Sequence, residues 1–102
     1  MNMIPVYQPS LNGREKEYVM RCLDTTWISS RGEFITEFEK AFAKYTGAEY
    51  ATTVANGTVA LHLALEALGI KSGDEVIVPT LTYIASVNTI VQTGASVVYA
   101  DQ

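Results

Sequence analysis

The sequence of 102 residues is long enough for one domain, and its composition excludes several classes of protein. Apolar residues make up 48% of the chain and charged residues 18%, a balance that is typical of globular rather than disordered proteins. The formal net charge of −4 argues against nucleic acid as a partner, because phosphate backbones are bound mainly by excess Lys and Arg. Cys22 is the single cysteine, which excludes an internal disulfide and a cysteine-rich metal site.

The first ten residues lack a basic start followed by an apolar core, so no signal peptide is predicted. No apolar run approaches the roughly 18 residues that a membrane-spanning helix needs. We therefore expect a cytoplasmic protein without a membrane partner.

Two helices are predicted in the first half of the chain. Ser10 is a candidate N-cap for a helix over about residues 12–25. After a loop rich in hydroxyl groups, apolar residues recur at helical spacing and predict a second helix over 33–46, with Gly47 as its C-terminal stop. The apolar faces comprise Tyr18, Val19, Cys22 and Leu23 in the first helix, and Phe34, Phe38, Ala41, Phe42 and Tyr45 in the second.

The second half of the chain alternates predicted strands with predicted helices. Strands are expected over 50–54, 75–79 and 95–101, with helices over 57–68 and about 80–93 between them. The β-branched run E-V-I-V-P fits a strand that is buried on both faces. This alternation implies a parallel sheet with right-handed crossovers, and the fold class is therefore α/β.

The turn Asn56-Gly57-Thr58 joins a predicted strand directly to a predicted helix and is a candidate phosphate site. The first amides of a helix have no internal partners, and the helix dipole adds partial positive charge there. Gly57 would let an anion approach the backbone, and Thr58 would add a hydroxyl. A tight turn with a small residue for packing explains the same sequence. The motifs for nucleoside triphosphates and dinucleotides are absent.

Tyr83 follows the predicted strand over 75–79 and begins the next helix. Ligands of open parallel sheets bind at the carboxyl ends of the strands, so Tyr83 is expected at the same edge as Gly57. A flat aromatic side chain beside a phosphate site suits a planar, phosphorylated ring. A tyrosine that only packs against the core is the alternative.

Two further features have more than one interpretation. Trp27 lies in the loop beside Arg31, where it either lines a binding site or anchors the loop to the core. His62 follows Thr58 by one helical turn, but no second His or Cys could share a metal ion with it. We therefore predict no metal site.

Five segments of the chain match the pattern of a known family. They are P-V-Y-Q-P-S-L-N-G, C-L-D-T-T-W-I-S-S-R-G, A-N-G-T-V-A-L-H-L-A-L, G-D-E-V-I-V-P-T-L-T-Y-I-A-S-V-N and G-A-S-V-V-Y-A-D. Together they resemble the DegT/StrS-type sugar aminotransferases, which use pyridoxal phosphate on the aspartate-aminotransferase-like fold (fold type I). The resemblance covers essentially the whole chain. It implies that residues 1–102 form the N-terminal portion of the large cofactor-binding domain of a longer enzyme.

The resemblance also implies roles for individual residues. At the positions of Gly57 and Thr58, the family's amides and hydroxyl hold the cofactor phosphate. At the position of Tyr83, the family's aromatic residue stacks on the pyridine ring. The loop that contains Trp27, Ser29 and Arg31 lies near the nucleotide-sugar site in relatives, so these three residues are predicted substrate contacts.

Other catalytic residues of the family are not predicted in this chain. None of the lysines at 16, 40, 44 and 71 matches the lysine that holds the cofactor. That lysine, and the carboxylate that faces the pyridine nitrogen, follow the position of Gln102 in relatives. We therefore predict no catalytic residue here and expect the chain to be inactive alone.

The resemblance further implies partners. Relatives transfer the amino group of glutamate to a keto nucleotide sugar, and they are homodimers whose sites combine residues of both subunits. The first two matching segments are most similar to those of enzymes that aminate carbon 4 of GDP-4-keto-6-deoxymannose. Another 3- or 4-keto nucleotide sugar is an alternative substrate. A small phosphate- or nucleotide-binding module without catalysis is the alternative function.

Overall fold

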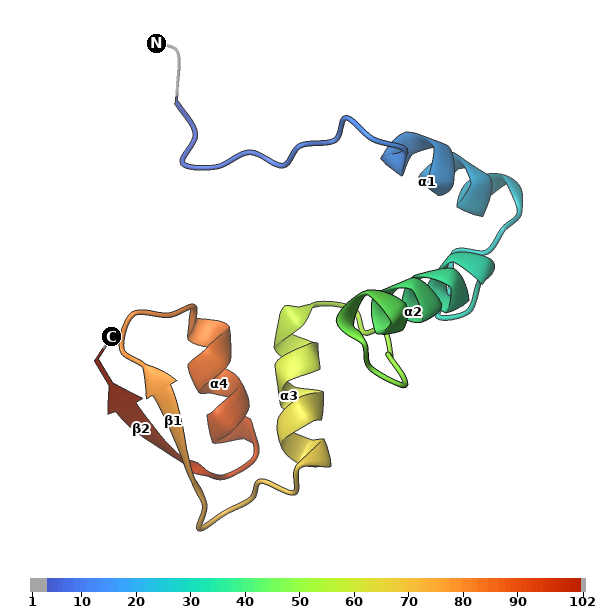
Figure 1. The fold of residues 1–102 in the computed structure, drawn as a ribbon. Coiled ribbons are helices and arrows are strands. Elements are labelled where there is room, and N and C mark those ends of the chain that lie inside the picture. The colour runs from blue at the N-terminus through green and yellow to red at the C-terminus, as the bar shows by residue number, and fades with distance from the viewer. Residues whose placement is uncertain (1–3, 102) are drawn as a thin grey trace. The chain divides into compact units, whose positions relative to one another are not determined.

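Residues 4–101 are described by the computed structural model, and they divide into a first unit that ends at Tyr50 and a second unit that begins at Ala51. The first unit contains α1 (Glu15–Asp24) and α2 (Glu33–Thr46); the second contains α3 (Gly57–Ala67), β1 (Glu75–Pro79), α4 (Ile84–Gln92) and β2 (Ser96–Ala100), as Figure 1 shows. No helix within residues 4–101 combines the length and apolarity that crossing a membrane requires.

Helix α1 is shorter than predicted, and the predicted cap at Ser10 is wrong. Arg14 occupies the N-cap position without a side-chain capping bond, and Ser10 lies in an irregular segment. Two features favour the later start. Gly13 has low helix propensity, and the carboxylates of Glu15 and Glu17 interact favourably with the helix dipole in the first turn.

Helix α2 has the predicted bounds. Gly47 follows it with φ = 73°, in the left-handed region that glycine adopts without a steric penalty, and its amide donates to the carbonyl of Ala43. Ala43 is also the residue of α2 that is buried, with 8% of its surface exposed. Tyr45, at the end of the predicted apolar face, is 88% exposed.

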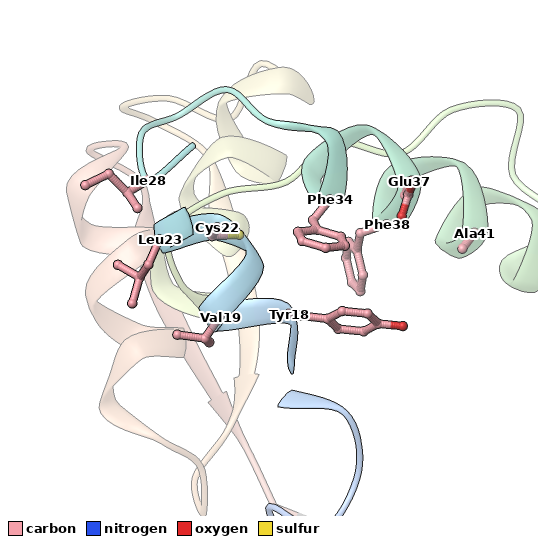
Figure 2. Close-up of a pocket in the computed structure, with 9 residues that line it drawn as sticks. All are labelled: Tyr18, Val19, Cys22, Leu23, Ile28, Phe34, Glu37, Phe38 and Ala41. Atoms are coloured by element: carbon pink, nitrogen blue, oxygen red, sulfur yellow. The ribbon is translucent and has the colours of Figure 1, made fainter. Parts of the chain in front are cut away.

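The facing sides of α1 and α2 form an apolar groove. The ring centroids of Tyr18 and Phe34 lie 4.9 Å apart, so the two helices contact each other at the predicted faces. Figure 2 shows the side chains around a cavity of about 530 Å³ between them. The cavity is lined by Tyr18, Val19, Cys22 and Leu23 from α1, by Ile28 from the loop, and by Phe34, Glu37, Phe38 and Ala41 from α2.

The second unit confirms the prediction of a parallel α/β arrangement. β1 and β2 pair in parallel, with Val78 opposite Tyr99, and α4 forms the crossover between them. Apolar side chains that point from the sheet towards α4 form the core. Its buried members are Val78, Ile90 and Ala95, with Leu65, Ile70, Val76, Val87 and Val97 packed around them.

Three predictions for this unit are wrong in detail. Residues 50–54 are irregular, because no strand within residues 4–101 pairs with them and a strand requires such a ladder. β1 is buried on one face only, since Val78 is 4% exposed and Ile77 is 73% exposed. Helix α4 begins at Ile84 rather than near residue 80, because the amide of Thr80 still bonds to the carbonyl of Ala100 in β2.

Candidate functional site

The starts of α3 and α4 lie at the same end of the second unit. The two helices pack side by side, and Figure 1 shows their N-terminal ends on the same side as the carboxyl ends of β1 and β2. Helix starts offer free amides and a partial positive charge. This end of the unit is therefore suited to an anionic ligand.

Asn56 organises the start of α3. Its backbone is extended (φ = −167°), and its Oδ1 accepts a hydrogen bond of 3.0 Å from the amide of Val59. Sequence reasoning included Asn56 in the turn without giving it this role, although an Asn directly before a helical segment is a strong signal for an N-cap. The cap leaves the amides of Gly57 and Thr58 without a hydrogen-bond partner among the described residues.

Gly57 is required neither by the backbone nor by packing within residues 4–101. Its φ lies outside the left-handed region, and a Cβ atom built there would have no atom within 4 Å. The alternative of a small residue needed for packing therefore has no support in the described residues. The open space beside Gly57 and two free amides, with the exposed Thr58 next in the sequence, fits a phosphate group.

Tyr83 is the N-cap residue of α4, with an extended backbone (φ = −69°, ψ = 140°). Its side chain is 79% exposed, so the alternative of a tyrosine packed in the core is wrong for the described residues. An exposed aromatic ring at the start of α4, at the same end of the unit as the start of α3, provides a flat apolar surface for a ring.

Trp27, Ser29 and Arg31 lie together in the first unit, in the loop between α1 and α2. All three line a pocket of about 250 Å³. Trp27 is 55% exposed, and the structure gives Arg31 no ion pair among residues 4–101. An unpaired guanidinium beside an indole ring can bind an anionic group attached to an aromatic base.

The loop is held at both ends. Thr25 closes α1 by donating from its hydroxyl to the carbonyl of Arg21, at 2.7 Å. The Nε of Arg21 lies 2.8 Å from Oε1 of Glu33 at the start of α2. Both side chains of this ion pair are about half exposed, so it contributes little stability, but it connects the two helix ends that flank the loop.

Lys71 lies away from the starts of α3 and α4, and His62 lacks the partners that a metal site needs. Lys71 precedes β1, at the end of the strand opposite to the one where Tyr83 lies. His62 has its Nε2 at 3.4 Å from Oε1 of Glu66, one turn further along α3. Within residues 4–101, no group of three His, Cys, Asp or Glu side chains could hold a metal ion.

Comparison with known proteins decides which family has this arrangement. The model of the DegT/DnrJ/EryC1/StrS aminotransferase family matches residues 9–102. The chain belongs to this family. It is 68% identical over 101 residues to the GDP-perosamine synthase of Escherichia coli O157:H7, an alignment that covers 99% of the chain and 28% of that enzyme.

Solved aminotransferase structures share the fold. The aminotransferase from Psychrobacter cryohalolentis has a TM-score of 0.84 and 40% identity, over 91% of this chain and 24% of that one. The E. coli GDP-4-keto-6-deoxy-D-mannose-3-dehydratase with bound hydrated PLP has a TM-score of 0.82 and 29% identity, over 95% of this chain and 26% of that one. The predicted fold class is thus confirmed, and pyridoxal phosphate is the cofactor of the family. The chain spans about a quarter of the length of these relatives.

Proposed function

We propose that this sequence is part of a pyridoxal-phosphate-dependent aminotransferase that transfers the amino group of glutamate to GDP-4-keto-6-deoxymannose. The observation that carries the proposal is the 68% identity to an enzyme named GDP-perosamine synthase, over 99% of this chain. The free amides and open space at the start of α3 support it independently, because they fit the cofactor phosphate.

The residues of the second unit have distinct parts in the proposed cofactor site. The amides of Gly57 and Thr58, with the Thr58 hydroxyl, bind the phosphate through charge-assisted hydrogen bonds. The exposed ring of Tyr83 covers one face of the pyridine ring and excludes water from it. When bound, the cofactor supplies an electron sink for amino transfer. The residues described here bind and orient it.

The loop of the first unit is proposed to contact the nucleotide sugar. Arg31 neutralises the diphosphate, and Trp27 offers a flat surface to a base or a sugar. Ser29 adds a hydroxyl in the same pocket. The shared pocket of these three side chains supports this assignment, and the substrate named by the 68% identical relative is the reason to choose a GDP-linked sugar.

The remaining proposals follow from the family and from the share of its length that this chain covers. We propose that residues 1–102 correspond to the N-terminal portion of the large cofactor-binding domain, and that the complete enzyme is a cytoplasmic homodimer. The lysine that holds the cofactor is then provided by a later part of the polypeptide. Alone, residues 1–102 are expected to form no amino sugar.

A chimera tests the proposed function. Residues 9–102 of this chain replace the matching segment of the E. coli O157:H7 GDP-perosamine synthase, to which they are closely similar. We expect the chimera to bind pyridoxal phosphate and to convert GDP-4-keto-6-deoxymannose and glutamate to GDP-perosamine. Residues 1–102 without the remainder serve as the control and should give no product.

Three results would contradict different parts of the proposal. A folded chimera that does not bind pyridoxal phosphate would show that the start of α3 is only a helix start. A chimera that binds the cofactor but aminates only another keto nucleotide sugar would reject GDP-4-keto-6-deoxymannose as the substrate. Product formation by residues 1–102 alone would reject the assignment of the catalytic lysine to a later part of the enzyme.

A further inference from the structure

The loop of residues 80–83 connects β1 to α4 and ends at Tyr83, whose side chain is 79% exposed. A ring that is exposed to this degree is not held in place by packing. Its position is therefore set by the backbone of the loop. Whatever fixes residues 80–83 also fixes the place from which the ring projects.

The loop is held on its strand side by Asp101, the residue after β2. The hydroxyl of Thr80 donates to Oδ1 of Asp101 at 3.0 Å, and the amide of Thr80 donates to the carbonyl of Ala100, also at 3.0 Å. Thr80 thus makes two bonds to consecutive residues, the last residue of β2 and the residue that follows it. The acceptor of the first bond is a carboxylate, which makes it stronger than a bond between neutral groups.

The loop is held on its helix side by the first turn of α4. The hydroxyls of Thr82 and Ser86 lie 3.2 Å apart and share a hydrogen bond. The amide of Ser86 donates to the carbonyl of Tyr83 at 3.0 Å. Both bonds connect residues that are close in sequence. The bond from Thr80 to Asp101 instead joins residues that are 21 positions apart, so it connects the loop to the sheet.

We propose that Asp101 is a positioning residue, which holds Thr80 so that the 80–83 loop presents the ring of Tyr83 to the pyridine ring of the cofactor. This inference rests on the proposed function and extends it to a residue that does not itself touch the cofactor. The bond acts on the ring only through the loop. Its loss should therefore weaken recognition of the cofactor ring and leave recognition of the phosphate unchanged.

The experiment compares Asp101→Ala with Asp101→Asn, which keeps an oxygen that can accept the bond from Thr80. In the chimera described above, Asp101→Ala should weaken pyridoxal phosphate binding about threefold to tenfold, and Asp101→Asn should restore most of it. The affinity for inorganic phosphate, measured by its competition with pyridoxal phosphate, should be the same in both variants. In a Tyr83→Ala background, Asp101→Ala should have no further effect, because the ring through which it acts is absent.

A second measurement needs no cofactor. In the 102-residue chain, Asp101→Ala should speed hydrogen exchange at the amide of Thr80, while exchange at the core residue Ile90 stays unchanged. Equal exchange at Thr80 in the parent and in Asp101→Ala would overturn the inference.

Two further results would also overturn the inference, while leaving the proposed function intact. One is that the parent chimera binds the cofactor and the Asp101→Ala chimera binds it equally tightly. The other is an undiminished effect of Asp101→Ala in the Tyr83→Ala background. A parent chimera that does not bind pyridoxal phosphate would instead reject the proposed function, and the positioning role with it.

Discussion

Substituting Gly57 by Ala should change fold stability and cofactor binding in opposite directions. The φ of Gly57 is compatible with any residue, and a Cβ atom there meets nothing within 4 Å. Replacing glycine by alanine at such a position reduces the conformational entropy of the unfolded chain. We therefore expect Gly57→Ala to raise the free energy of unfolding by about 0.4 to 1 kcal/mol.

The same methyl group should weaken the proposed phosphate site. The open space beside Gly57 is the space that a phosphate needs to reach the amides of Gly57 and Thr58. Displacing the anion from one such charge-assisted bond costs about 1 to 3 kcal/mol. This corresponds to a loss of cofactor affinity of roughly 5-fold to 150-fold, since 1.36 kcal/mol is tenfold.

Urea unfolding of the 102-residue chain measures the first effect, and titration of the chimera with pyridoxal phosphate by absorbance measures the second. Gly69→Ala, at the other end of α3, is the matched control. Its Cβ would also meet nothing, but its φ of 76° lies in the left-handed region. The control should therefore lose about 1 kcal/mol of stability and keep its cofactor affinity. If Gly57→Ala binds pyridoxal phosphate as tightly as the parent, the reasoning about the open space is refuted.

Three further predictions concern stability and pH. Ile90→Ala removes three carbons from a side chain that is 3% exposed, so it should lower the free energy of unfolding in urea by about 2 to 5 kcal/mol. The control Val91→Ala, at a position that is 59% exposed, should change this free energy by no more than about 0.5 kcal/mol. Asn56→Ala removes the cap of α3 and should lower the free energy of unfolding by about 1 kcal/mol. Asn56→Asp can still accept the hydrogen bond from the amide of Val59 and should keep most of this stability; equal losses in the two variants would contradict the capping role. The hydrogen bond from Arg14, at 2.8 Å, lowers the pKa of Glu17 below its usual value of 4.5. Its contribution to stability is therefore present above the ordinary pKa of a glutamate and is lost as the pH falls through the lowered one. Arg14→Gln should raise the NMR titration midpoint of Glu17, and an unchanged midpoint would show that the pair does not form in solution.

The helices and the two strands of the structure could be predicted because their signals are local. The spacing of Phe34, Phe38 and Ala41 and the stop at Gly47 predict α2 with its observed bounds. The β-branched run of β1 predicts a strand wherever a neighbour is available. The cap at Ser10 failed for a local reason, the low helix propensity of Gly13, but the other failures concern features that depend on a distant partner. Residues 50–54 have strand-forming side chains but no pairing strand among the described residues, and a strand cannot form without one.

For the candidate site, the sequence alone is enough to predict which side chains and free amides are available. An Asn-Gly-Thr turn before a helix offers unpaired amides and a hydroxyl in any protein, because hydrogen bonding within a helix leaves its first amides free. The tertiary structure was needed to show that the space beside Gly57 is open, whereas the shared end of α3 and α4 was expected from the predicted parallel sheet. It also decided that Asp101 reaches Thr80. The contact of Asp101 with Thr80 arises from the pairing of β1 with β2, which brings residues 21 positions apart within hydrogen-bond distance, and no local pattern in the sequence specifies such a contact.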